Sequence, residues 1–168
     1  SWLSAAAIVS KCTRVSEPLA PLNAFVEEEA FKLYRADTGL LAASYEALPE
    51  DVLPRNEKGA RFRGGLVENY VMQQLNAADV SPHYWGIPSK AEVDFVARDE
   101  QGDIIPIEVK SGANVRSNSL EAYRKKYDPP YVARLSTRNF GQERFVKSIP
   151  LYAACFFAKK FIRSPAYV

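Results

Sequence analysis

Two carboxylates and one lysine lie in neighbouring apolar runs near the middle of the chain. Asp94 belongs to the run 92–96, and Glu108 and Lys110 belong to the run 105–111. Side chains on a β-strand alternate between its two faces, so Glu108 and Lys110 share one face while the apolar residues between and before them take the other. The spacing therefore predicts an acid and a base side by side on one strand.

A turn at 101–103 separates the two runs, and this predicts a hairpin that brings Asp94 near Glu108. Strict alternation along the first strand of this hairpin places Val93, Phe95 and Ala97 on one face and Glu92, Asp94 and Val96 on the other. Glu92 is then a further carboxylate on the face of Asp94, although a solvated edge residue is the simpler interpretation.

This combination of side chains suits phosphodiester hydrolysis assisted by a hard cation. Mg²⁺ or Mn²⁺ binds oxygen ligands, takes one or two carboxylates from the protein and fills its other positions with water and phosphate. We expect Asp94 and Glu108 to be metal ligands and Lys110 to stabilise negative charge on the phosphate. Glu68, on a predicted helix before the hairpin, is expected to support the metal or its water.

The hydrophobic pattern predicts the elements that position these residues. A helical period runs over 60–78, a strand over 80–85 precedes the hairpin, and a helix over 117–127 is followed by a strand over 130–135. A closing helix is expected over 149–161, although the aromatic content of this stretch allows a strand in part of it. The predicted class is α/β, with a mixed central sheet flanked by helices and the order helix, three strands, helix, strand (αβββαβ).

The first fifty residues predict a separate extension. Apolar runs at 5–15 and 31–34 suggest two strands around a loop, and Asp37 is a candidate cap for a short helix. The polar, proline-containing stretch 48–58 favours a boundary that divides residues 1–50 from residues 51–168. Because the chain begins without Met, it is expected to be a fragment of a longer polypeptide.

Composition excludes several function classes. The formal net charge of +2 gives no global basic field, so nucleic-acid contact must come from local patches. Two distant cysteines and the single histidine, His83, do not make a zinc site, and they favour a reducing cytoplasm. No run of 18 apolar residues predicts a membrane span. Oligomeric state is left open.

Glu68, Asp94 and the triplet 108–110 resemble the PD-(D/E)XK signature of restriction-endonuclease-like proteins, with Val93 where that signature has proline. The segments 31–41, 65–71, 92–96, 105–112 and 149–152 together resemble the uncharacterised C-terminal domain of a group of prokaryotic AAA-type ATPases. The resemblance implies a restriction-endonuclease-like fold, an upstream ATPase module in the same polypeptide, and a winged-helix segment whose tail is within residues 1–50. ATP is expected only in that missing upstream module, because this chain has no phosphate-binding loop motif.

The expected function is a metal-dependent nuclease or nucleic-acid-binding domain, on DNA or RNA. The alternative is a non-catalytic protein-interaction or regulatory module of the attached ATPase. Lys58, Arg61 and Arg63, ahead of the Glu68 helix, are weak candidates for phosphate contact, and Arg55 falls in the same cluster. The phenylalanines at 156, 157 and 161 are predicted to be core residues rather than base-stacking platforms.

Overall fold

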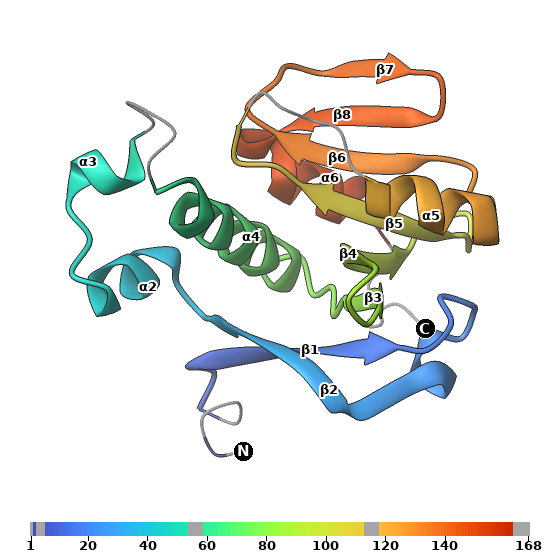
Figure 1. The fold of residues 1–168 in the computed structure, drawn as a ribbon, viewed down its shortest axis with the longest axis horizontal. Helices are drawn as coiled ribbons and strands as arrows, with labels where there is room; N and C mark the ends of the chain where they lie inside the picture. The colour runs from blue at the N-terminus through green and yellow to red at the C-terminus, as the bar shows by residue number, and fades with distance from the viewer. Residues whose placement is uncertain (1, 3–5, 54–58, 113–117, 163–168) are drawn as a thin grey trace.

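The computed structural model describes residues 2, 6–53, 59–112 and 118–162. Eight strands in this part of the chain form one mixed sheet in the order β2-β1-β3-β4-β5-β6-β8-β7 (Figure 1). The strands are β1 (Val9–Val15), β2 (Val26–Arg35), β3 (His83–Ile87), β4 (Ala91–Arg98), β5 (Ile104–Val109), β6 (Val132–Ser136), β7 (Gly141–Glu143) and β8 (Val146–Pro150). The predicted α/β class with a mixed sheet is confirmed.

The hairpin that carries the candidate site is confirmed as β4 and β5. The two strands are antiparallel, with Phe95 opposite Ile107. The side chain of Asp99 closes the turn, because its Oδ1 accepts hydrogen bonds from the backbone N–H groups of Gln101 and Asp103 at 3.0 and 2.9 Å. Gly102 adopts a φ of +97°, a conformation that side chains disfavour. The sequence of this turn therefore fixes the register that sets Asp94 near Glu108.

Strict alternation along β4 was wrong at one position. Val93 packs in the same hydrophobic cluster as Val96, whereas Phe95 packs in the cluster on the opposite side. The pairing of β4 with β3 shifts here, since Trp85 lies opposite Val93 but His83 lies opposite Val96. Such an irregularity re-aims side chains locally, and Asp94 lies inside it.

Five α-helices occur in the described residues: α2 (Thr38–Ser44), α3 (Pro49–Val52), α4 (Ala60–Asn76), α5 (Asn118–Tyr127) and α6 (Ala154–Phe161). Short 3₁₀ turns precede β2 (η1, Leu22–Phe25) and α6 (η2, Leu151–Ala153). The predicted helices over 60–78 and 117–127 correspond to α4 and α5. The order from α4 to β6 is helix, three strands, helix, strand, as the sequence predicts.

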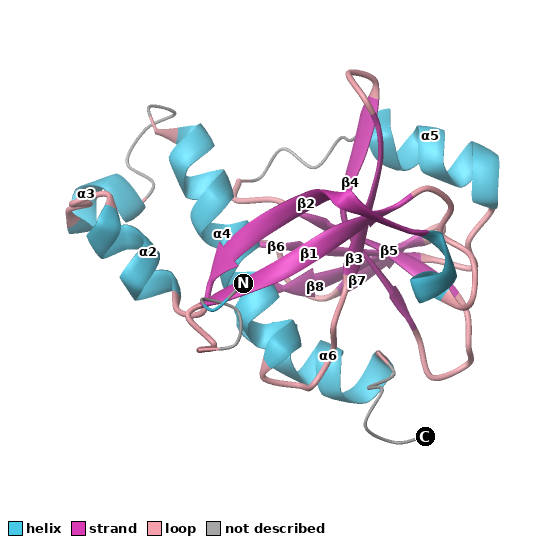
Figure 2. Cartoon of the chain, turned by 90° about the horizontal axis from the view of Figure 1, so that it is seen from below, coloured by secondary structure: helices cyan, strands magenta, loops and turns pink. Residues whose placement is uncertain are grey.

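The helices cover the two faces of the sheet unequally (Figure 2). Residues of α4 and α6 form one core with Phe95, Ile105 and Ile107. Residues of α5 form the other core with Trp85 and Val96. The site strands are therefore packed on both faces, which holds their backbones rigidly beneath the charged side chains.

The N-terminal strands belong to the same sheet as the site. β1 pairs with β2 antiparallel, as predicted, and also with β3 in parallel, through Arg14 opposite Tyr84 and Val15 opposite Trp85. Asp37 caps α2 by accepting a hydrogen bond from Leu40 N at 2.9 Å, as the sequence predicts. The division between residues 50 and 51 stays a prediction. The pairing of β1 with β3 joins the two parts of the chain that this division separates.

The C-terminal part differs from expectation in three respects. β7 was not predicted, since it is three residues long and all three are exposed. β8, which lies between β6 and β7 in the sheet, was not predicted either. Phe157 is a core residue as predicted, but the predictions for Phe156 and Phe161 were wrong: they are 78% and 44% exposed, because both line an open groove rather than the core. None of the described helices has both the length and the apolar character needed to cross a membrane.

Candidate functional site

Glu108 is the most deeply placed acid of the candidate site. Its side chain on β5 is 4% exposed, and its Oε1 forms an ion pair with Lys110 Nζ at 2.5 Å. Its second oxygen, Oε2, is buried without a hydrogen-bond partner in the described part of the chain. A buried carboxylate oxygen without a partner is costly, so this atom marks a place where a donor or cation is expected.

Asp94 faces the same region from β4. Its Oδ2 accepts a hydrogen bond from the backbone N–H of Val109 at 2.7 Å, which ties the two strands together at the level of Glu108. Burial, followed by the charges of Glu108 and Glu68, raises the pKa of Asp94 to about 8. At neutral pH this carboxyl group is therefore mostly protonated when no cation is bound.

Glu68 enters the region from α4 and is held by two side chains of β2. Its Oε1 accepts hydrogen bonds from the Tyr34 hydroxyl and from Lys32 Nζ, the latter at 3.0 Å. Lys32 also pairs with Glu92 Oε1 at 2.6 Å. Burial opposes the charge of Lys32, but Glu68, Glu92 and Asp94 outweigh it and raise the pKa of that ammonium above its ordinary value. Lys32 is therefore a permanent cation between two carboxylates.

The three predicted acids share one arrangement. Each is anchored through a single oxygen: Glu68 by Tyr34 and Lys32, Asp94 by the backbone of Val109, and Glu108 by Lys110. The anchoring fixes each carboxylate through one oxygen, and among the described residues the second oxygen of Glu108 has no hydrogen-bond partner. Anchored carboxylates of this kind resemble metal ligands that are oriented by a second layer of hydrogen bonds.

The described residues set a limit on how many of these acids bind one ion. In them, no group of three or more His, Cys, Asp and Glu side chains converges closely enough to hold a metal. A cation at Asp94 and Glu108 must then complete its shell with water or substrate oxygens, as Mg²⁺ commonly does. Glu68 would then lie outside the direct ligands of such an ion.

Lys32 and Tyr34 are site residues that the sequence interpretation missed. Both lie on the face of β2 that turns towards α4, while Phe31 and Leu33 lie on the other, exposed face. The alternation of the run 31–34 contained this signal. What the sequence could not show is that this strand lies against the helix that carries Glu68.

The comparison with known protein families covers the centre of this site. A family described as a domain of unknown function, DUF4143, matches residues 63–154, more than half of the chain. The chain belongs to the DUF4143 family. No curated protein and no solved structure matches it. The DUF4143 match contains all four predicted site residues, and it leaves Lys32 and Tyr34 outside its limits.

A broad groove opens beside the site, between β2, α2 and the first half of α4. Its volume is about 1520 Å³, and its lining includes Lys32, Tyr34, Glu68 and Glu92. Arg61 also lines it and is exposed. Arg63 is half-buried on the same helix, whereas Lys58 and Arg55 lie outside the described residues. One basic candidate for phosphate contact is thus placed along a groove that reaches Glu68.

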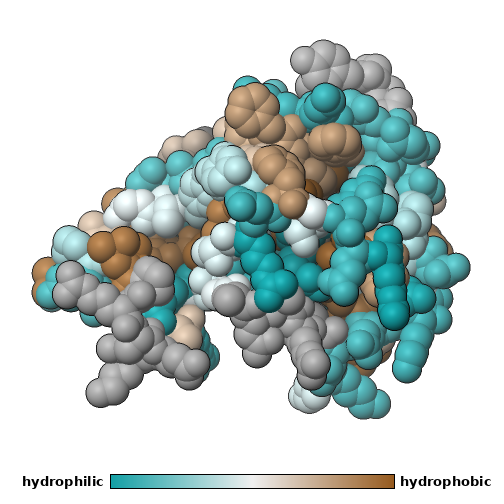
Figure 3. All heavy atoms as spheres, turned by 90° about the horizontal axis from the view of Figure 1, so that it is seen from above, coloured by the Kyte–Doolittle hydropathy of each residue, from teal (hydrophilic) through white to brown (hydrophobic). Residues whose placement is uncertain are grey.

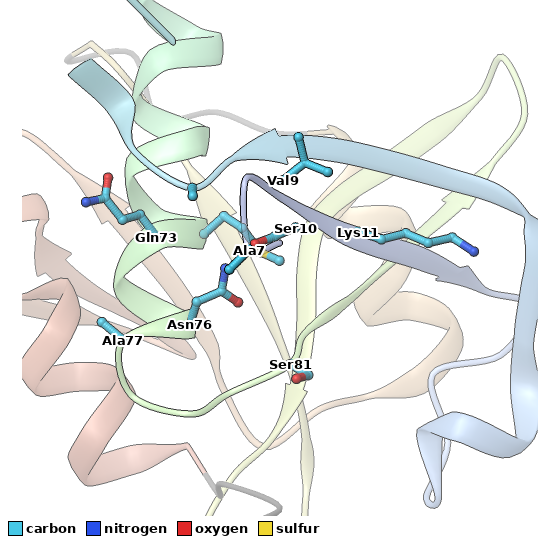
Figure 4. Close-up of a pocket in the computed structure, with 10 residues that line it drawn as sticks. Ala7, Val9, Ser10, Lys11, Gln73, Asn76, Ala77 and Ser81 are labelled. Atoms are coloured by element: carbon cyan, nitrogen blue, oxygen red, sulfur yellow. The ribbon is translucent and has the colours of Figure 1, made fainter. Parts of the chain in front are cut away.

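A second cavity lies at the far end of α4, against β1 (Figure 4). Its volume is about 570 Å³, and small or uncharged side chains line most of it. Asn76 donates a hydrogen bond to Ser10 Oγ at 2.7 Å across this space. Lys11 is the only charged side chain in the lining that the structure describes. We assign this cavity no chemistry.

Proposed function

We propose that this DUF4143 domain is a metal-dependent nuclease of the restriction-endonuclease-like, PD-(D/E)XK type. The observation that carries the proposal is the buried Glu108 Oε2, which has no hydrogen-bond partner in the described part of the chain, beside Asp94, whose pKa is raised by burial and by the charges of Glu108 and Glu68. Asp94 and Glu108 would hold Mg²⁺ or Mn²⁺. When bound, such an ion supplies charge neutralisation on the phosphate and a more acidic water.

The charge of the site supports a divalent ion. Four carboxylates, those of Glu68, Glu92, Asp94 and Glu108, meet two ammonium groups, those of Lys32 and Lys110. With all six groups ionised, four negative and two positive charges leave a net charge of −2. A dication balances this charge, whereas protonation of Asp94 removes only half of it.

Lys110 and Glu68 have separate roles in the proposed reaction. Lys110, held by Glu108 and 28% exposed, can contact a non-bridging phosphate oxygen. Glu68, immobilised by Tyr34 and Lys32, can orient an attacking water with its second oxygen. Because Glu68 pairs with the ammonium of Lys32, its carboxylate is suited to accept a hydrogen bond rather than to donate one.

The wider setting belongs to the same proposal. By the resemblance described above, the chain would be the C-terminal part of a prokaryotic, cytoplasmic AAA-type ATPase, with nucleic acid and the upstream ATPase module as its partners. The groove beside Glu68 and the exposed Arg61 support nucleic acid as the substrate.

Metal binding is tested first. Calorimetric titration with Mn²⁺ should show binding to the wild-type chain, and Glu108→Gln and Asp94→Asn should each weaken it at least about tenfold, or about 1.4 kcal/mol. The exposed turn residue Glu100 gives a matched control, since Glu100→Gln should bind Mn²⁺ like the wild type. If all four proteins bound Mn²⁺ equally, Asp94 and Glu108 would not form a metal site.

Cleavage is tested second, with single-stranded DNA, supercoiled DNA and RNA in Mg²⁺ or Mn²⁺. Glu108→Gln and Lys110→Met should abolish cleavage. Metal binding without cleavage of any substrate would leave a nucleic-acid-binding or regulatory module in place of a nuclease. Cleavage that survives both substitutions would place the activity elsewhere.

A further inference from the structure

An apolar groove lies at the opposite edge of the sheet from β2, between the edge strand β7 and helix α6. Its volume is about 510 Å³. The sheet contributes Gln142 and Ile149 to its wall, and the segment just before β7 contributes Phe140. α6 contributes Phe156 and Phe161. β7 is separated from β5 by β6 and β8, so the groove is distinct from the carboxylate site.

Large apolar side chains are exposed around this groove. Phe140 is 66% exposed, Phe156 78% and Tyr152 71%, and Phe140 and Tyr152 pack edge to face with ring centres 6.4 Å apart. Figure 3 looks onto the side of the molecule that β7 and β8 form in Figure 1, and shows hydrophobic side chains gathered there next to hydrophilic ones. A cluster of this kind on a small domain usually marks a binding surface.

The charges of the groove have one sign. Lys147 and Lys160 line it, and no described acidic residue does. Lys147 Nζ lies 3.4 Å from the centre of the Tyr131 ring, which holds the ammonium over the floor of the groove. A ligand with apolar and anionic groups is therefore complementary to this surface.

The backbone of β7 identifies the kind of ligand. β7 is the last strand of the sheet, and it pairs with β8 on one side only. Within the described ranges, its outer N–H and C=O groups face no other strand. An open edge beside an apolar groove and a helix suits an extended peptide, which adds a strand and places alternate side chains into the groove.

We propose that the groove between β7 and α6 binds an extended peptide segment of a partner protein, in which every second side chain faces the groove and these groove-facing side chains include both apolar and acidic residues. The peptide pairs with the outer edge of β7, its apolar side chains contact Phe156 and Phe140, and its carboxylates contact Lys147 and Lys160. A nucleic acid cannot form the backbone pairing with β7, which is why a peptide fits this surface better.

The test uses the whole 168-residue chain and a fluorescein-labelled octapeptide in which serine alternates with groove-facing residues that are in turn phenylalanine and glutamate, and binding is measured by fluorescence anisotropy. Binding is expected, and Phe156→Ser and Lys160→Glu should each raise Kd at least about fivefold. Phe31→Ser, which alters a half-exposed phenylalanine on β2, is the matched control and should leave Kd unchanged. Circular dichroism and urea unfolding check that all variants fold.

Two altered peptides separate the contribution of backbone pairing from that of the glutamate charges. N-methylation of alternate backbone nitrogens blocks strand pairing and should abolish binding, and replacement of glutamate by lysine should abolish it as well. The proposal is overturned by absence of binding at millimolar peptide, by binding that both protein variants retain, or by equal binding of the lysine or N-methylated peptide. It is also overturned if oligo(dT) binds at Phe156 and Lys160 and the peptide does not.

Discussion

At the scale of single residues, the surroundings of Glu108 lower the stability of the folded chain. Its carboxylate is buried, one of its oxygens has no hydrogen-bond partner among the described residues, and it lies near another carboxyl group, that of Asp94. An unsatisfied buried polar group costs about 1–3 kcal/mol. Buried acids with an unsatisfied oxygen are typical of functional sites, because function requires a charged group in surroundings that disfavour charge.

Glu108→Gln should therefore stabilise the metal-free protein. The substitution removes a buried charge while keeping the shape of the side chain, although it also removes the ion pair with Lys110. We expect the free energy of unfolding, measured by urea titration in EDTA, to rise by about 1 kcal/mol. The exposed Glu100→Gln should change it by less than about 0.5 kcal/mol. A loss of stability in Glu108→Gln would show that the acid has a structural role.

Asp94 makes stability depend on pH. Its pKa in the folded chain is about 8 against an ordinary value of 3.8, so folding favours the protonated form. The contribution of this group to stability is complete below pH 4 and is lost progressively as the pH rises towards 8. Asp94→Asn lacks this dependence, so its advantage over the wild type should grow between pH 4 and pH 8 and level off above.

The measurement is urea unfolding in EDTA at one-unit pH intervals, where a single group changes stability by at most about 1.4 kcal/mol per unit. Glu29→Gln, at an exposed position of β2, should give a curve parallel to that of the wild type. Parallel curves for Asp94→Asn and the wild type would mean that Asp94 titrates normally, and the electrostatic support for a cation site would be lost.

At the scale of elements, the site depends on how α4 holds the end of β2. The side chain of Asn69, which is 2% exposed, accepts from Arg35 N at 2.8 Å and donates to Arg35 O at 3.1 Å. One buried amide thus satisfies both backbone groups at the end of β2. Tyr34 and Lys32 lie just before this point, so the clamp also positions the two side chains that hold Glu68.

Asn69→Leu should be strongly destabilising for this reason. The substitution keeps the volume but leaves the backbone N–H and C=O of Arg35 unsatisfied, at about 1–3 kcal/mol each. We expect a loss of about 2–4 kcal/mol in urea unfolding. Gln101→Leu, in an exposed turn, should change stability by less than about 0.5 kcal/mol. If Asn69→Leu behaves like Gln101→Leu, the clamp does not hold β2 in solution.

The elements also show what the sequence could predict. The hairpin of β4 and β5 and the helix α4 follow from local patterns, namely alternation, a turn closed by Asp99 and a helical period. The pairing of β1 with β3 joins residues about seventy positions apart and leaves no local pattern. β7 was missed because its three exposed residues contain no apolar alternation, and the shift in β4 was missed because it depends on its partner strand.

The site residues that share one hairpin were predictable from the sequence, whereas contacts between distant elements were not. The neighbourhood of Asp94, Glu108 and Lys110 needed only one hairpin, so the spacing was sufficient to propose it. The contacts of Glu68 with Tyr34 and Lys32 needed the non-local arrangement of β2 against α4, which no spacing in the chain encodes. The N-terminal strands therefore contribute more to the site than the sequence pattern indicates.

At the scale of the whole molecule, both hydrophobic cores extend across the boundary predicted between residues 50 and 51. Cys12 and Tyr34 are buried in the core formed with α4 and α6, and Val15 is buried in the core formed with α5. A chain reduced to residues 51–168 would expose the partners of these side chains, including Trp85, and would free the edge of β3. A domain that loses part of two cores rarely keeps a cooperative transition.

The truncated chain of residues 51–168 should therefore lose the sharp urea transition of the full chain and bind a hydrophobic dye such as ANS, as loosely packed states do. The comparison is made by circular dichroism and dye fluorescence. The control removes only residues 1–5, which precede β1, and should unfold like the full chain. A truncated chain that unfolds cooperatively at the same urea concentration as the full chain would establish residues 51–168 as an independent domain. The strands β1 and β2 would then be an attachment that positions Lys32 and Tyr34 at a site already formed without them.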